Sequence, residues 1–172
     1  MSWEHVVSAV VALSPECPAG PTRLIGIDPG TEQSGLVVMV DGRVTSCGVY
    51  PNDEVLNELD FHGGCPVAIE MIASYGMAVG KEVFETCVWI GRFLQAAGED
   101  RVRLVYRKDV KLHLCQSVKA KDANIRQALI DKFGGSKEAA IGKKATPGPL
   151  FGVASHAWAA LAVAVTALET PA

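Results

Sequence analysis

The sequence predicts a mixed α/β fold, in which a five-stranded sheet carries helices on both faces. Three short segments rich in β-branched residues follow one another at residues 23–28, 34–40 and 43–50, and they predict three antiparallel strands. Two further apolar segments, at residues 66–71 and 101–106, predict a fourth and a fifth strand. Segments with helical spacing separate these later strands, and strands that are reached through helices commonly lie parallel in one sheet.

Turn and cap residues mark where several of these elements end. Pro29-Gly30 closes the first strand, and Asp41-Gly42 is a strong signal for a two-residue hairpin. Gly98 and Gly134-Gly135 are placed to end two helices, and Ser155 is the predicted N-cap of the last one. The helices are expected at residues 52–59, 79–97, 108–115, 122–133 and 155–169.

The composition is that of an ordinary globular protein, with 172 residues, 49% hydrophobic and 20% charged. No apolar run reaches the roughly 18 residues that span a bilayer, and the apolar start lacks the basic residues of a secretory signal. We therefore expect a cytoplasmic protein with one domain at residues 23–172, after an extension at residues 1–22 that is flexible or a short helix. The five cysteines form no C-x-x-C pair, which argues against a zinc motif and a disulfide framework.

Charge is distributed unevenly along the chain. Residues 101–144 contain twelve basic and four acidic residues, a net charge of +8. The remainder contains four basic and fifteen acidic residues, a net charge of −11. Such an asymmetry suits a protein with one phosphate-binding side, although a solvated helical surface would show the same pattern.

Two acids stand at the ends of buried strands. Asp28 ends the first strand in the run Ile-Gly-Ile-Asp-Pro-Gly, and Glu70 ends the fourth in Val-Ala-Ile-Glu. The first and fourth strands are neighbours in the predicted sheet, so the two carboxylates are expected to face each other. Facing carboxylates repel unless a cation lies between them, and paired Mg²⁺ ions are a common solution in phosphodiester cleavage. The alternatives are a turn-capping Asp28 and a surface salt bridge at Glu70.

Two further side chains are candidates for the same site. His156 opens the last helix, where it could bind a metal or move protons, or serve as a polar surface group. Residue 159 lies one turn further on the same face. Asp122 begins an amphipathic helix, so it is either the N-cap of that helix or an additional carboxylate of the site.

Taken together, these segments resemble those of RuvC-type Holliday junction resolvases, which have the RNase H-like fold. The similarity runs in order from about residue 23 to residue 169 and includes the final helix, His-Ala-Trp-Ala-Ala-Leu-Ala-Val-Ala-Val-Thr-Ala. The segment Pro-Gly-Pro-Leu-Phe-Gly at residues 147–152 is similar to phage-encoded members. The resemblance implies an endonuclease that binds two Mg²⁺ or Mn²⁺ ions and cuts four-way junctions and other branched DNA. Asp28, Glu70 and His156 match its metal ligands.

One position departs from the family pattern, which has an Asp three residues after the first group of the last helix. This chain has Ala159 there, and an alanine side chain cannot bind a metal. Either an Asp has been changed to Ala to stop cleavage, or the natural protein lacks the acid and uses His156, with Asp122. In both cases we expect weakened binding of one metal ion and lower activity.

The resemblance also indicates DNA contacts and a partner. An aromatic residue after the fourth strand stacks on bases in the family, and Tyr75 is the candidate here, the alternative being a Tyr packed on the domain surface. A homodimer is expected, with Trp89, Ile90 and Phe93 of the helix at residues 79–97 as its surface, the alternative being that this apolar face belongs to the core. The candidates for phosphate contacts are Lys108, Lys111, Lys119, Lys121, Lys143 and Lys144.

Three other functions share part of this sequence pattern. A non-catalytic binder of branched DNA would share the basic side and the defect at residue 159. A nuclease for RNA–DNA hybrids would share the fold and the carboxylates. An actin-like or sugar-kinase ATPase would share the segment Ile-Gly-Ile-Asp-Pro-Gly-Thr, but it needs a second domain and a second phosphate loop, for which this chain is too short.

Overall fold

Five strands form one sheet in the computed structural model, which describes residues 22–171. Their order is β3-β2-β1-β4-β5, with β1, β2 and β3 antiparallel and with β4 and β5 parallel to β1. The strands are β1 (Arg23–Asp28), β2 (Gln33–Val40), β3 (Arg43–Pro51), β4 (Val67–Met71) and β5 (Val102–Tyr106). The predicted mixed sheet is confirmed, and each strand ends within one residue of its expected bounds.

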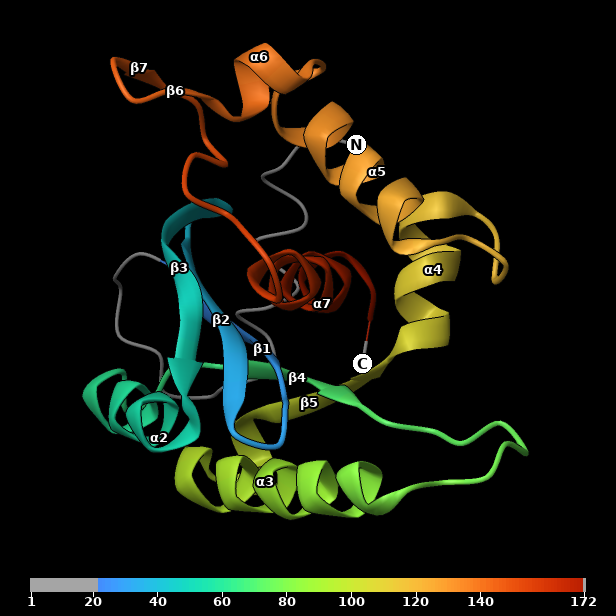
Figure 1. Ribbon diagram of the computed structural model, residues 1–172. Coiled ribbons are helices and arrows are strands. Elements are labelled where there is room, and N and C mark those ends of the chain that lie inside the picture. Colours follow the sequence, from blue (N-terminus) through green and yellow to red (C-terminus); the bar gives the residue numbers. More distant parts are fainter. Residues whose placement is uncertain (1–21, 172) are drawn as a thin grey trace.

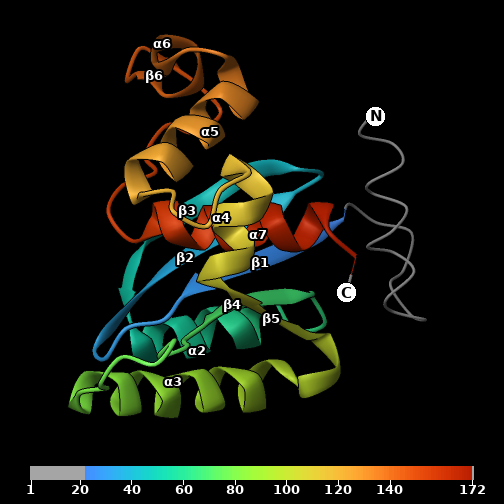
Figure 2. The same cartoon turned by 90° about the vertical axis from the view of Figure 1, so that its right-hand side faces the viewer.

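Helices cover both faces of the sheet (Figures 1 and 2). On one face lie α2 (Asn52–Phe61) and α3 (Lys81–Ala97), and on the other lies α7 (Ala157–Glu169), with α4 (Arg107–Cys115) and α5 (Asp122–Gly134) packed outside it. All five predicted helices are therefore present. The short 3-10 turn η1 (Glu99–Arg101), the one-turn α6 (Lys137–Ala140) and the hairpin of β6 (Gly142–Lys143) and β7 (Thr146–Pro147) were not predicted.

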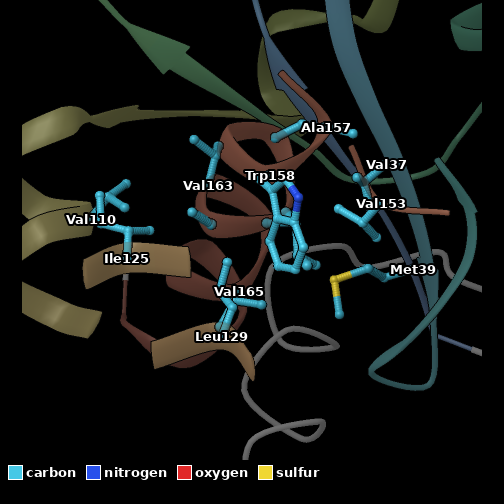
Figure 3. Close-up of a cluster of buried hydrophobic side chains, with 14 of the residues drawn as sticks. Val37, Met39, Val110, Ile125, Leu129, Val153, Ala157, Trp158, Val163 and Val165 are labelled. Atoms are coloured by element: carbon cyan, nitrogen blue, oxygen red, sulfur yellow. The ribbon is translucent and has the colours of Figure 1, made fainter. Parts of the chain in front are cut away.

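The strand alternation of β1 divides the core into two clusters. Leu24 belongs to the cluster around α7, whereas Ile25 and Ile27 belong to the cluster under α2 and α3. Successive side chains of a strand point to opposite faces, so a strand with apolar residues on both sides must be covered twice. Figure 3 shows α7 enclosed between the sheet residues Val37 and Met39 and the outer helices. This burial on all sides explains why α7 is apolar around its whole circumference.

Gly26 allows α7 to pack directly on β1. A Cβ atom at this position would lie 2.4 Å from the carbonyl oxygen of Ala160 and 2.8 Å from the Cβ of Ala164. Both distances are far shorter than van der Waals contact, and a backbone atom cannot turn away as a flexible side chain can.

Gly26→Ala is accordingly expected to destabilise the fold by about 1–3 kcal/mol through overpacking. Urea denaturation monitored by circular dichroism measures this loss. Gly91→Ala, at a helical glycine whose Cβ would meet nothing within 4 Å, is the matched control and should be neutral or stabilising. Equal stability of the two variants would contradict the proposed close packing.

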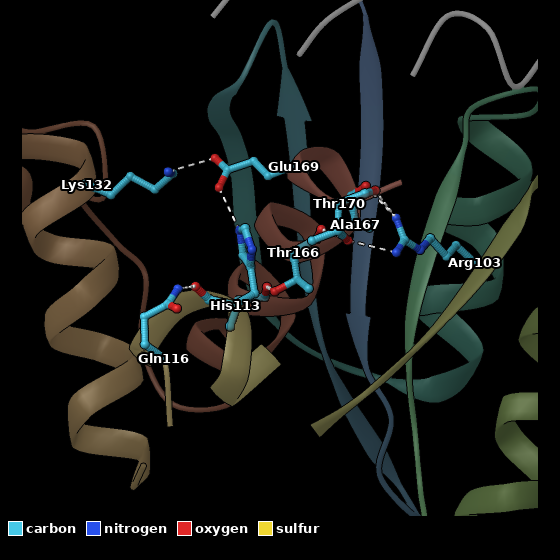
Figure 4. Close-up of polar contacts among 9 residues, drawn as sticks. Arg103, His113, Gln116, Lys132, Thr166, Ala167, Glu169 and Thr170 are labelled. Atoms are coloured by element: carbon cyan, nitrogen blue, oxygen red, sulfur yellow. Dashed lines mark hydrogen bonds and ion pairs between the residues drawn. The ribbon is translucent and has the colours of Figure 1, made fainter. Parts of the chain in front are cut away.

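Polar contacts fix the C-terminal end of α7 (Figure 4). Glu169 pairs with Lys132 of α5 and His113 of α4, each at 2.8 Å. Arg103 of β5 donates to the carbonyl oxygen of Ala167 at 2.9 Å and to the hydroxyl of Thr170 at 2.8 Å. Cations near the last carbonyls of a helix are favourable because these groups carry partial negative charge. These contacts anchor the C-terminal end of α7 to β5, α4 and α5.

The structure corrects two predictions about helix residues. Ile90 and Phe93 are buried in the core under the sheet, so the expectation that they supply a dimer surface is wrong. The exposed apolar side chains of α3 are instead Phe84 and Val88. Ser155 is not the N-cap of the last helix, because its φ is 46° and the cap position falls on His156.

The extension predicted at residues 1–22 lies, apart from Thr22, outside the described residues. In the part of the chain that the structure describes, no helix is both long and apolar enough to cross a membrane.

Candidate functional site

Asp28 and Glu70 lie side by side at one edge of the sheet. β1 and β4 are parallel neighbours with Ile27 opposite Ile69, so the residue that follows each of these positions emerges at the same end. The side chains are only 16% and 14% exposed, and their carboxyl groups are within hydrogen-bonding reach of each other. The structure thus brings together the two acids that the sequence predicted to face each other.

His156 completes this group from the start of α7. Its Nδ1 lies 3.0 Å from Oδ2 of Asp28. An ionised carboxylate can only accept, so Nδ1 donates in this bond, which in a neutral imidazole leaves the lone pair on Nε2. The approach depends on Gly35 of β2, where a Cβ would lie 2.4 Å from the carbonyl oxygen of His156. His156 therefore sits against the sheet, although its side chain is 68% exposed.

Arg107 joins two of the acids and was not predicted as a site residue. Its Nη1 lies 3.4 Å from Oε2 of Glu70, and its Nη2 donates to Oδ1 of Asp122. Asp122 is the first residue of α5 and not its N-cap, which is Lys121, so the capping alternative is wrong. The signal that could have identified Arg107 is its position directly after β5, a parallel neighbour of β4, at the edge that carries Glu70.

A buried polar network fixes the turn that follows Asp28. The hydroxyl of Ser34 donates to Oδ1 of Asn52 at 2.6 Å and accepts from the backbone N–H of Gly30 at 3.2 Å. The side-chain amide of Asn52 donates in turn to the carbonyl oxygen of Gly30 at 3.0 Å. Ser34 and Asn52 thus support the loop next to the site, and sequence analysis missed both because they lie far apart along the chain.

Burial makes the negative charge of this site costly. Burial raises the pKa of Glu70 to about 7, and although Arg107 opposes this shift, the charges of Asp28 and Asp122 add to it. Burial also raises the pKa of Asp28 above its ordinary value, against the opposing effects of His156 and Arg107. Two neighbouring buried acids with raised pKa values are typical of a functional site.

All five predicted catalytic positions line one cavity of about 430 Å³. Ala159 is among them, half-buried on the same face of α7 as His156. Arg126 also lines the cavity, with its guanidinium 4.6 Å from the ring centroid of Trp158. The full lining is Asp28, Glu70, Arg107, Asp122, Ile125, Arg126, Ser155, His156, Trp158 and Ala159.

The donor set fits one divalent cation better than two. Mg²⁺ is commonly bound by one or two carboxylates while water and substrate phosphates complete its shell, and Asp28 and Glu70 offer such a pair. No cluster of three or more His, Cys, Asp and Glu side chains within residues 22–171 is arranged as a metal site. A second ion lacks the donor that an acid at residue 159 would supply, and Asp122 is paired with Arg107.

The predicted DNA-contacting residues lie outside the cavity lining. Tyr75 is 59% exposed at a φ of 47° in the loop between β4 and α3, so it is not packed on the domain surface. This loop extends away from the sheet in Figure 1. The candidate lysines lie on α4, on the β6–β7 hairpin or next to α5. Lys111 is half-buried, and the others are exposed: Lys108, Lys119, Lys121, Lys143 and Lys144.

No protein-family model and no curated protein matches the chain in sequence. Two solved structures of RuvC from Thermus thermophilus match its fold. RuvC in complex with a Holliday junction substrate is 22% identical, with a TM-score of 0.61 over 86% of this chain and 93% of that one. A second RuvC structure is 23% identical, with a TM-score of 0.55 over 84% and 92%. The predicted RNase H-like fold, in the form that RuvC has, is confirmed.

Proposed function

We propose that this chain is a divalent-metal-dependent endonuclease that cuts four-way junctions and other branched DNA. The observation that carries the proposal is the pair of buried carboxylates, Asp28 and Glu70, beside His156 in one cavity. The fold supports the same reaction, since one of the RuvC structures that it resembles contains a Holliday junction substrate. The family pattern that the sequence resembles has an Asp at position 159, where this chain has Ala.

The proposed reaction is hydrolysis of a phosphodiester. A water oxygen bonds to phosphorus, the bond from phosphorus to the 3′ oxygen breaks, and that oxygen takes up a proton, which leaves a 5′-phosphate and a 3′-hydroxyl. A bound Mg²⁺ or Mn²⁺ ion supplies charge stabilisation and lowers the pKa of water. Asp28 and Glu70 would hold the ion, and Nε2 of His156 would accept the proton from water or bind metal. Asp28 keeps the imidazole oriented through Nδ1.

Nucleic acid is favoured as the substrate class by the distribution of charge, and the Holliday junction in the similar RuvC complex favours branched DNA. The segment with a net charge of +8 contains α4, α5, α6 and β6, and the cavity lies where α4 and α5 meet the sheet. Lysines there would neutralise phosphates without reading sequence. The proposal includes a homodimer, because a junction has two symmetric strands to cut. Its contact surface would be the exposed face of α3 around Phe84 and Val88.

The test uses a labelled four-way junction, a linear duplex of the same sequence and an RNA–DNA hybrid, each incubated with Mg²⁺ or Mn²⁺. The chain and its A159D variant are expected to bind the junction most tightly, and at least the variant is expected to cut it. Cleavage of the hybrid alone would replace the proposal with an RNase H activity. Junction binding without cleavage by either protein would indicate a non-catalytic binder, and no junction binding at all would refute the proposal.

Tyr75 is expected to contribute to junction binding by stacking on a base. Tyr75→Ala should weaken binding about fivefold or more, since such stacking is worth about 1–3 kcal/mol per base. The dissociation constant is measured by fluorescence anisotropy in Ca²⁺ at fixed salt. Phe61→Ala, which removes an exposed aromatic ring on α2, is the control and should bind as the parent does. Unchanged binding by the Tyr75 variant would remove this residue from the DNA contacts.

A further inference from the structure

Arg107 places a permanent positive charge among the acids of the cavity. It is the first residue of α4, directly after β5, and Met71 pairs with Tyr106, so Arg107 emerges at the edge where Glu70 lies. Its guanidinium contacts Glu70 and Asp122, and its side chain is only 26% exposed. Although burial alone would lower it, the charges of Glu70, Asp122 and Asp28 hold the pKa of Arg107 above its ordinary value. An arginine in this setting does not lose its proton.

A purely structural role explains this arrangement poorly. Asp122, the partner on α5, is 82% exposed, and ion pairs with exposed partners contribute little to stability. The contact with Glu70 is long, at 3.4 Å, which leaves it weaker than a well-formed bidentate pair. These two bonds use two of the five N–H groups of the guanidinium, and the remaining donors are suited to phosphate oxygens.

One position in the cavity lining lacks the acid that a second metal ion would need. Residue 159, where an acid would help to hold a second ion, is Ala, and it lines the same cavity as Arg107. The two acids nearest to Arg107 would otherwise be free to draw in a further cation. Resting on the proposed function, we infer that Arg107 takes the place of a second metal ion: it balances Glu70 and Asp122 and donates to the phosphate being cut.

The first arm of the test titrates Mn²⁺ alone into the protein by calorimetry. The parent is expected to bind one ion per chain, and Arg107→Gln to bind Mn²⁺ about tenfold more tightly or to take up a second ion, because Glu70 and Asp122 lose their competing cation. Arg107→Lys keeps the charge and should stay within threefold of the parent. Arg43→Gln, at an exposed arginine at the far end of β3, is the matched control. Parent-like Mn²⁺ affinity and stoichiometry in R107Q would overturn the inference.

The second arm measures single-turnover cleavage of the four-way junction at saturating Mn²⁺. R107Q should cut about 100-fold more slowly than the parent despite its tighter metal binding, as expected when a charge-stabilising donor is lost. In the A159D background, which supplies a donor for a second ion, the same change should cost less than tenfold. If Arg107 formed only structural ion pairs, R107Q would not combine tighter metal binding with slower cleavage. Nor would its effect on the rate be smaller in the A159D background. If the parent cuts, equal rates for R107Q and the parent would refute the inference, and if only A159D cuts, the Mn²⁺ titration decides.

The two arms separate this inference from the proposed function. If no protein cuts any substrate, including A159D, the proposed nuclease activity fails, and the Mn²⁺ titration alone decides whether Arg107 competes with a cation. Circular dichroism and thermal unfolding establish that each variant is folded. If R107Q does not fold, the R107K variant decides. If Arg107 acts as a fixed positive charge, R107K should cut within about tenfold of the parent. A larger loss contradicts that role.

Discussion

Asp28→Asn is expected to abolish the proposed junction cleavage, with a loss of at least about 1,000-fold, equivalent to about 4 kcal/mol in the activation free energy. The carboxylate is 16% exposed, faces Glu70 and receives the Nδ1 hydrogen of His156, so in the proposed reaction it would both hold the metal ion and orient the proton acceptor. Asparagine keeps the size of the side chain and removes its charge. Single-turnover rates at saturating Mg²⁺ measure the loss, in the parent and in the A159D background.

The folded state of the Asp28 variant should be intact. Burial disfavours the charged form of Asp28, so an uncharged isostere is expected to leave the thermal stability of the metal-free protein equal or higher. Junction binding should also persist, since the candidate phosphate contacts lie outside the cavity. Asp60→Asn, at an exposed acid of α2, is the matched control and should cut as the parent does. Cleavage by D28N at the parent rate would place the active site elsewhere in the chain.

The success of sequence analysis at Asp28 and Glu70 has a simple physical basis. Each acid directly follows a short apolar strand, and the adjacency of those two strands follows from the order of the elements. The strand pattern therefore predicted both the fold and the principal pair of acids. His156 could not be placed in this way, because a helix that packs across β1 and β2 can begin at either end of β1, and it was the resemblance that assigned His156 to the site.

The residues that sequence analysis missed act through contacts between distant segments. Arg107 was counted only as one charge of a basic segment, since nothing local distinguishes it from Lys108. Its role depends on the parallel register of β4 and β5 and on where α5 begins. Ser34 and Asn52 are separated by a hairpin, and their hydrogen bond exists only after β2 and β3 have paired. The β6–β7 hairpin was missed because two-residue strands carry no periodicity.

Ala159→Asp is expected to raise both metal affinity and cleavage rate. Residue 159 lies one helical turn after His156 and lines the cavity with Asp28 and Glu70, so a carboxylate there adds an anionic donor where the donor set is incomplete. We expect at least about a tenfold gain in Mn²⁺ affinity, since even residues supporting metal ligands commonly contribute 10–100-fold. The cleavage rate should rise by a similar or larger factor. Calorimetry and single-turnover kinetics measure the two effects separately.

The size of the gain distinguishes the two explanations of Ala159. If the parent does not cut and A159D cuts rapidly, the site lacks only this acid, as expected when an Asp has been changed to Ala. If the parent cuts and A159D gains little, the chain completes its site with other groups, for which His156, Asp122 and Arg107 are present. Ala159→Asn adds a side chain of the same size without charge, so a gain shared by A159N would reflect packing. If A159D changes neither affinity nor rate, the absence of an acid at residue 159 does not limit this site.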